Sequence, residues 1–334
     1  MRVVENLNQA LRGLLDEDPS LFLLGEDIVD PYGGAFKATR GASTRHPDRV
    51  LATPISEGGI TGIAAGLALA GDRAIVEIMF GDFLALCFDQ IVNFASKSVT
   101  MYGRRVPMRL VVRCPVGGNR GYGPTHSQSP QKHFVGVPNL ALFEMTPFHD
   151  NTATFSRMLD RGEPCIHFED KILYTQRMYR GGRVDGLLRY DFVGADGGTA
   201  RVRVEDPDEA EQVVIVPGGL ANPVLAAVRS LFLAEERSCL VYVPSQLYPF
   251  DLDPLLPSLR RAGRVVIVEE GTAGGTWGAD VAQLIHQKLW RDLRRPVRLV
   301  HSAPSVVPTA PHLERGVLVQ ESTIYQALRE TEDA

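Results

Sequence analysis

Three polar segments interrupt otherwise apolar text in the first half of this 334-residue chain. TPISEGGITG carries Glu57 at a predicted strand-to-helix junction, and EIMFGDFLALCFDQ places Phe80 and Phe83 just before a helix. CPVGGNRGYGPTHSQS is a glycine-rich loop that contains His126. A carboxyl group and an imidazole can both move protons near neutral pH. Taken alone, Glu57 also fits a helix-end acid stabilised by the helix dipole, and the two phenylalanines fit core packing.

The elements that must position these residues alternate between short apolar runs and helical patterns. Four runs predict buried strands, at Leu21–Leu24, Ala74–Met79, Leu110–Val112 and Cys165–Phe168. The clearest helical pattern spans Leu84–Tyr102, with Phe88, Val92, Ala95 and Val99 on one stripe. This alternation predicts an α/β fold with a mostly parallel, doubly wound sheet. The loop with His126 follows a strand end, where such sheets bind ligands.

A composition shift at about Arg180–Asp208 predicts a linker with one edge strand. After it the alternation restarts, and four more runs predict strands, at Val213–Val216, Leu240–Val243, Val265–Val268 and Val297–Val300. We therefore expect two doubly wound α/β domains, at residues 1–190 and 200–334.

Bulk composition excludes several classes of protein. A net charge of -5 with no basic cluster argues against a nucleic-acid partner. No run of 18 apolar residues exists, so we expect no membrane span. The N-terminus fits an amphipathic helix with Leu7, Leu11 and Leu14 on one face, and not a signal peptide. The four cysteines lack metal-ligand spacing and indicate reduced core residues of a cytoplasmic protein.

The polar segments occur in a specific order with other motifs: LFLLGEDIVDPYGGAFKATRG, RVLATPISEGGITGIAAGLALAG, EIMFGDFLALCFDQIVN, GYGPTHSQS, EPCIHFEDKILY, GRVVIVEEGTAGGTWGADVAQLI and TAPHLE. In this order the chain resembles the beta subunit of the thiamine diphosphate-dependent component of pyruvate, branched-chain 2-oxo acid and acetoin dehydrogenase complexes. The resemblance implies a pyrimidine-binding transketolase-like domain followed by a transketolase C-terminal-type domain. It also implies an α2β2 heterotetramer that shares thiamine diphosphate between alpha and beta chains.

The resemblance also assigns roles to residues of this chain. Glu57 corresponds to the glutamate that activates the aminopyrimidine, and Phe83 to the aromatic residue that packs on that ring. Leu86, Glu26 and Ile55 are expected to line the same cofactor pocket. His126 corresponds to the substrate-side histidine that assists acyl transfer. The diphosphate- and magnesium-binding G-D-G…N motif is absent from the chain, so the alpha subunit is expected to hold magnesium.

A potassium site made of backbone carbonyl groups is a further implication. It would use Leu110, Met158, Leu159, Arg161 and Glu163. The chain departs from the family in its second domain, where D-L-R-T-x-x-P-L-D is replaced by YVPSQLYPFD and an Asp by Pro304. These departures put the usual acyltransferase partner in doubt more than the thiamine chemistry.

The leading hypothesis is decarboxylation of a 2-oxo acid, with acyl transfer to a lipoyl domain or another carrier protein. A transketolase-like pair that moves a two-carbon ketol unit is the second hypothesis. Such pairs need extra cationic residues, and this cleft segment offers only His126, Arg113 and Arg120. A non-catalytic scaffold subunit is the third, and the presence of Glu57 argues against it.

Overall fold

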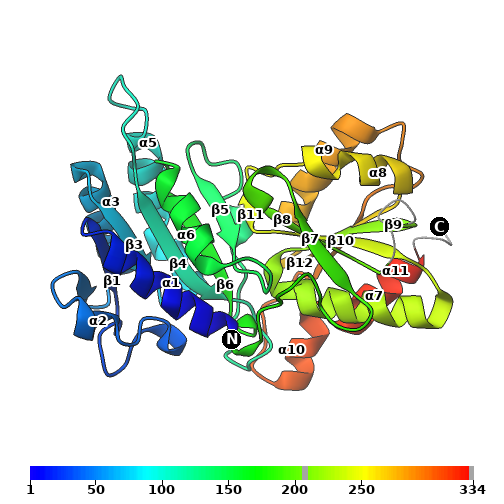
Figure 1. The fold of residues 1–334 in the computed structure, drawn as a ribbon, viewed down its shortest axis with the longest axis horizontal. Helices are drawn as coiled ribbons and strands as arrows, with labels where there is room; N and C mark the ends of the chain where they lie inside the picture. Colours follow the sequence, from blue (N-terminus) through cyan, green and yellow to red (C-terminus); the bar gives the residue numbers. More distant parts are fainter. Residues whose placement is uncertain (205–209, 331–334) are drawn as a thin grey trace. The chain divides into compact units, whose positions relative to one another are not determined.

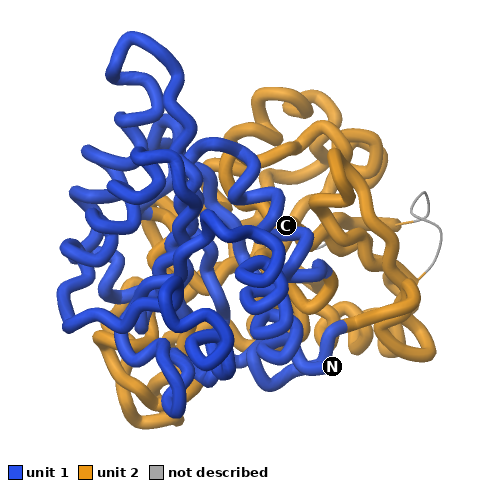
Figure 2. The backbone as a smooth tube through the Cα atoms, turned by 60° about the vertical axis from the view of Figure 1, so that its left-hand side comes forward, with its two compact units in different colours: residues 1–116, 133–145, 149–178 blue, residues 117–132, 146–148, 179–334 orange. Residues whose placement is uncertain are grey.

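The computed structural model describes residues 1–204 and 210–330, which form two compact units (Figure 2). The first unit comprises residues 1–116, 133–145 and 149–178, and the second comprises 117–132, 146–148 and the described residues from 179 onward. The glycine-rich loop and residues 179–190, which the sequence placed in the first domain, thus group with the second unit. Both units contain parallel strands flanked by helices, which confirms the predicted α/β class.

The first unit is built on parallel strands in the order β5-β6-β4-β3-β1-β2. Their bounds are β1 Leu21–Gly25, β2 Val50–Ala52, β3 Arg73–Glu77, β4 Leu110–Val116, β5 Ala141–Glu144 and β6 Cys165–Asp170. Its helices are α1 Val3–Glu17, α2 Ala42–Arg45, α3 Glu57–Ala70, α4 Leu84–Asp89, α5 Ser96–Ser98 and α6 Asn151–Asp160.

Helices cover this sheet as the hydrophobic patterns require. Leu7, Leu11 and Leu14 of α1 are buried in one core cluster with residues of α6 and the strands, as predicted for an amphipathic helix. Figure 1 shows α1 and α6 on the near side of the sheet.

The helical stripe predicted over Leu84–Tyr102 is partly wrong. A π-helical turn at Gln90–Ala95 joins α4 and α5, and Phe88 is 41% exposed. Ala95 and Val99 are buried as predicted, and the other buried apolar side chains there are Leu84, Cys87 and Ile91. The wider π turn breaks the regular 3.6-residue period on which the prediction rested.

The second unit is built on a mixed sheet with strand order β13-β12-β9-β10-β8-β7. Its strands are β7 Arg189–Val193, β8 Thr199–Arg203, β9 Gln212–Ile215, β10 Cys239–Pro244, β12 Val265–Thr272 and β13 Arg298–Ser302, and a further short strand is β11 Gln246–Tyr248. Its helices are α7 Ala221–Glu235, α8 Leu256–Ala262, α9 Trp277–Leu289, α10 Pro311–Val317 and α11 Glu321–Glu330. Figure 1 shows α7 and α11 on one side of the sheet and α8 and α9 on the other.

The segment predicted to be a linker contains two strands rather than one. β7 pairs with β8, and β8 pairs with β10, both antiparallel. The last residues of the predicted linker, 205–208, lie outside the described residues.

Two further expectations concern the chain as a whole. Each of the four cysteines is a buried free thiol. Within residues 1–204 and 210–330, no helix combines the length and hydrophobicity needed to cross a bilayer.

Candidate active site

Two glutamates meet at the ends of neighbouring elements in the first unit. Glu26 directly follows β1, and Glu57 is the first residue of α3. Their exposed fractions are only 9% and 7%. Burial raises the pKa of Glu26, and the negative charge of Glu57 raises it further, while a hydrogen bond from the Ser56 backbone opposes the shift. One Glu26 oxygen, Oε1, is buried and has no hydrogen-bond partner among the residues that the structure describes.

Local sequence explains why the two carboxyl groups converge. Parallel strands bring their carboxyl ends to one sheet edge, where the following loops and helices begin. A Cβ at Gly58 would stand 3.0 Å from the Leu86 carbonyl oxygen, so the glycine lets α4 approach α3 closely.

The aromatic and aliphatic residues predicted to line the pocket lie on or beside α3 and α4, whose backbones approach each other at Gly58 and Leu86. Phe83 is half-buried, and its ring meets that of Phe80 edge to face at 6.1 Å between centroids. Ile55 precedes α3 and is 82% exposed, whereas Leu86 on α4 is 60% exposed. Cys87, one residue on, is fully buried, and desolvation raises the pKa of its thiol to about 11, with smaller contributions from Glu57 and Glu26. The sequence did not indicate that this thiol lies beside the glutamates.

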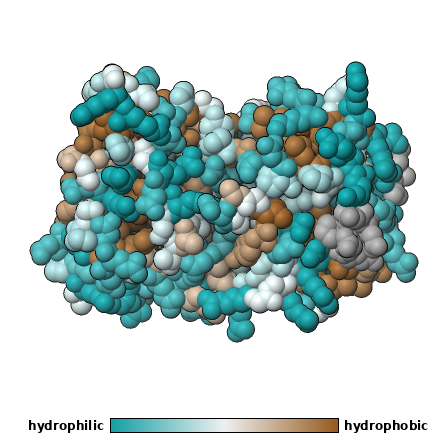
Figure 3. Space-filling view, turned by 45° about the horizontal axis from the view of Figure 1, so that its top comes forward, coloured by the Kyte–Doolittle hydropathy of each residue, from teal (hydrophilic) through white to brown (hydrophobic). Residues whose placement is uncertain are grey.

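Several large apolar side chains on α3, on α4 or in the segment that precedes α3 are exposed. They are Leu51, Ile55, Ile63, Leu86 and Phe88. Figure 3 shows one face of the molecule, on which hydrophilic residues predominate with hydrophobic residues among them.

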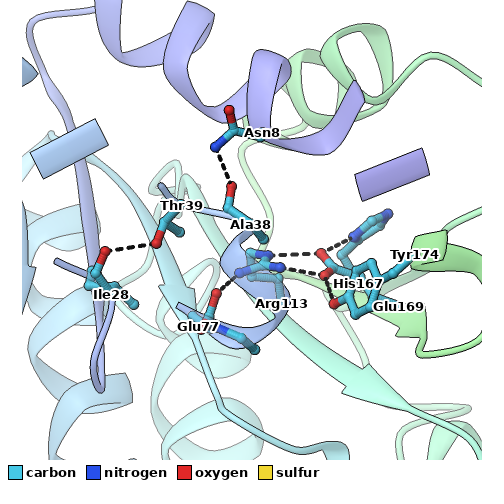
Figure 4. Close-up of polar contacts among 10 residues, drawn as sticks. Asn8, Ile28, Ala38, Thr39, Glu77, Arg113, His167, Glu169 and Tyr174 are labelled. Atoms are coloured by element: carbon cyan, nitrogen blue, oxygen red, sulfur yellow. Dashed lines mark hydrogen bonds and ion pairs between the residues drawn. The ribbon is translucent and has the colours of Figure 1, made fainter. Parts of the chain in front are cut away.

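A second cluster of charged residues is completely buried in the first unit (Figure 4). The Arg113 guanidinium donates to both oxygens of Glu169, at 2.8 and 2.5 Å, and also to Glu77. Tyr174 donates to Glu169 at 2.5 Å, and His167 Nδ1 lies 3.0 Å from it. Burial opposes ionisation of Glu169, but Arg113 and His167 outweigh it and lower its pKa to about 2.

This cluster corrects one expectation from the sequence. Arg113 was counted among the residues able to meet a substrate, but its side chain is fully buried and bound to two carboxylates. The sequence signal for such a buried cluster is the presence of charged residues within otherwise apolar strands. Glu77 and Arg113 are paired neighbours on β3 and β4, so a buried ion pair was the simplest solution.

The buried cluster also holds the chain segment that follows Glu26. Glu77 accepts a hydrogen bond from the backbone N–H of Ala35 at 2.7 Å. Gly34 has a φ of +70°, and a Cβ there would stand 2.9 Å from a Glu77 carboxylate oxygen. Thr39 donates to the Ile28 carbonyl, and Asn8 donates to the Ala38 carbonyl (Figure 4).

His126 belongs to the loop that groups with the second unit. The residue is half-buried, and its Nδ1 lies 3.0 Å from the Thr125 hydroxyl. The loop closes at its base through a hydrogen bond from Gly117 N–H to the Gln128 carbonyl.

The residues predicted to bind potassium are neighbours at one end of α6. Leu110 starts β4, Met158 and Leu159 end the helix, and Arg161 and Glu163 lie in the turn before β6. The carbonyl oxygens of Met158 and Glu163 lie 3.6 and 3.5 Å from the same atom, Cys165 Sγ. The potassium site stays a prediction.

Comparisons with known proteins agree with this organisation. Residues 1–176 match the family described as transketolase, pyrimidine binding domain, and residues 200–324 match transketolase, C-terminal domain. A pyruvate dehydrogenase E1 component subunit beta from Leifsonia xyli is 31% identical over 92% of this chain and 88% of its own length. An acetoin:2,6-dichlorophenolindophenol oxidoreductase subunit beta from Cupriavidus necator is 29% identical over 97% and 95%.

Solved structures show the same fold at lower identity. A split-gene transketolase, an inactive beta4 tetramer, superposes with a TM-score of 0.73 at 18% identity, covering 99% of this chain and 98% of that one. A transketolase from Campylobacter jejuni gives a TM-score of 0.68 at 12% identity, covering 99% of this chain and 46% of that one.

Proposed function

Because the chain belongs to the family of E1-component beta subunits with transketolase-type domains, we propose that it is the beta subunit of a 2-oxo acid dehydrogenase-type enzyme. The enzyme depends on thiamine diphosphate, decarboxylates a 2-oxo acid and transfers the acyl group to a carrier. The observation that carries this proposal is the buried pair of Glu26 and Glu57.

The pair fits the aminopyrimidine end of thiamine diphosphate. Glu26 Oε1 is buried and lacks a partner, which is the property expected of an acceptor that a bound amine would satisfy. When bound, thiamine diphosphate supplies the nucleophilic carbon and the electron sink for decarboxylation. Glu57 would hydrogen-bond a ring nitrogen of the aminopyrimidine, and its low exposure would strengthen that bond. Phe83 would pack on the ring, and Ile55 and Leu86 would line the pocket.

An alpha subunit completes the site. This chain lacks the G-D-G…N motif, so we assign magnesium and the diphosphate to the alpha chain in an α2β2 heterotetramer. The exposed apolar residues around α3 and α4 support a partner chain at this surface, because large exposed apolar patches mark interfaces. Potassium at the carbonyl groups of Leu110, Met158, Leu159, Arg161 and Glu163 would tie the end of α6 to β4.

His126 serves the acceptor step. An imidazole on a loop beyond a strand end can move a proton at the sulfur of a lipoyl domain or a carrier-protein thiol. The burial of Arg113 leaves fewer cations for the hydroxyl and phosphate groups of a ketose phosphate. It therefore favours a small 2-oxo acid over a ketol donor.

The proposal is tested by reconstitution with the alpha subunit. We expect the isolated chain to be inactive and to bind thiamine diphosphate weakly, because it lacks the diphosphate-binding motif. Addition of an alpha subunit should produce 2-oxo acid-dependent reduction of an artificial electron acceptor. Tight, stoichiometric binding of thiamine diphosphate to the isolated chain in calorimetry would contradict the shared site.

A further inference from the structure

Two glutamates of the second unit hold the His126 loop by its backbone. Glu270 in β12 accepts a hydrogen bond from Gly118 N–H at 2.7 Å. Glu314 in α10 accepts one from Gly121 N–H, at 3.1 Å to Oε2. Beyond His126, Lys132 Nζ donates to the Thr272 carbonyl at 3.0 Å, so the loop is fixed on both sides of the histidine.

The packing around Gly118 shows how closely the loop is held. A Cβ at Gly118 would stand 2.3 Å from a Leu318 methyl carbon and 3.4 Å from a carboxylate oxygen of each glutamate. The two carboxylates, which come from distant parts of the sequence, therefore converge on one point of the loop. Glu314 is only 2% exposed, although buried carboxylates are rare unless they have a specific partner.

We propose that Glu270 and Glu314 are positioning residues that fix the loop so that His126 can serve the acceptor step. The inference rests on the function proposed for His126. A backbone N–H bonded to a carboxylate forms a charge-assisted hydrogen bond, stronger than a neutral one. Two such bonds three residues apart fix both the position and the direction of the chain that leads to His126. The C-terminal unit would thereby contribute to catalysis through its own carboxylates.

Amide hydrogen exchange of the full-length chain tests the anchoring directly. In Glu314→Ala, exchange in residues 117–132 should rise by about tenfold or more, because a bond to a charged group is lost. Exchange in α7, in the same unit but outside this contact, should stay near its wild-type value. Glu314→Gln keeps an acceptor oxygen for Gly121 N–H and should restore most of the protection. Glu270→Ala should act in the same direction as Glu314→Ala.

Activity of the enzyme assembled with its alpha subunit tests the consequence. Glu314→Ala should lower kcat for transfer to the carrier by about tenfold more than kcat for reduction of an artificial acceptor. KM for the 2-oxo acid should change little. Unchanged exchange in 117–132 would overturn the proposal, as would a rise that is equal in α7 and is not reduced in the Gln variant.

His126→Ala separates this inference from the function on which it rests. If His126→Ala slows transfer but Glu314→Ala does not, the positioning role is wrong and the histidine role stands. If Glu314→Ala releases the loop and slows transfer while His126→Ala transfers normally, the anchors are supported and the role of His126 is wrong.

Discussion

Two carboxylate clusters in the first unit differ in how their charge is compensated. Glu77 and Glu169 share the guanidinium of Arg113, and every one of these groups is buried. Within the described part of the chain, no basic side chain forms an ion pair with Glu26 or Glu57, and the pKa of Glu26 is raised by burial and by Glu57. A compensated cluster suits a scaffold, whereas an uncompensated one suits a group that awaits a ligand.

The two clusters are linked through the backbone of the first unit. The Glu77 carboxylate binds the backbone at Ala35, within the segment that follows Glu26 in the chain. The compensated cluster therefore fixes the backbone next to the uncompensated pair. Stability and reactivity are assigned to different glutamates, and substitutions should separate the two properties.

Removal of the central cation should have the largest effect. Arg113→Met leaves Glu77 and Glu169 buried without their partner, and breaking a buried pair destabilises a protein by about 3–5 kcal/mol. The free energy of unfolding from urea titration measures this loss. Arg201→Met is the matched control, because Arg201 makes a bidentate pair with Asp191 that is partly exposed. The free energy of unfolding of Arg201→Met should fall by about 1 kcal/mol or less. Equal losses of stability in the two variants would contradict the distinction between a buried and a partly exposed ion pair.

Glu57→Gln should affect activity and leave the fold intact. The substitution is nearly isosteric, but the amide cannot exchange a proton with a ring nitrogen. Turnover of the assembled enzyme should fall by about a hundredfold or more, the usual loss for a positioned acid–base group. Glu17→Gln, at an exposed position, is the control and should retain wild-type turnover. Near-normal turnover of Glu57→Gln would contradict the assignment of Glu57 as the acid–base group of the cofactor site.

Glu26→Gln should have the smallest effect of the three substitutions. Unlike Arg113→Met, it should stabilise the fold. Because the folded-state pKa of Glu26 is raised, the free energy of unfolding falls as the pH rises from the unfolded-state pKa to the folded-state pKa. The variant should therefore melt at a higher temperature than wild type at pH 7. Below the usual carboxyl pKa of about 4.3, where Glu26 is protonated in both states, the difference should disappear. A variant that is less stable at pH 7 would indicate a structural role.

The sequence predicts strands and cofactor residues where the pattern is strong. Uninterrupted apolar runs such as Leu110–Val112 lie in fully buried strands, because a parallel sheet covered on both faces leaves no exposed side. The edge strand β7 and its neighbour β8 mix buried and more exposed residues, a weaker signal that we interpreted as a linker with one edge strand. The motif around Glu57 is one short continuous segment, so the sequence alone identifies it as a candidate site.

Contacts between residues far apart in the sequence cannot be predicted from such local patterns. Arg113, Glu77 and Glu169 lie on three strands, and only the sheet order brings them together. Glu270 and Glu314 meet Gly118 and Gly121 across more than 150 residues of sequence. Sequence motifs identify which residue types are present, but partners of this kind follow from topology.

The central claim is that Glu57 activates a cofactor bound beside Glu26. The most direct test is the rate of hydrogen–deuterium exchange of the thiazolium proton of thiamine diphosphate, measured by quenched NMR in the assembled enzyme. With cofactor bound at saturation, exchange in Glu57→Gln should be slower than in wild type and Glu17→Gln by about a hundredfold or more. Equal exchange rates in the three proteins would contradict the claim, because the proton would then be removed without Glu57.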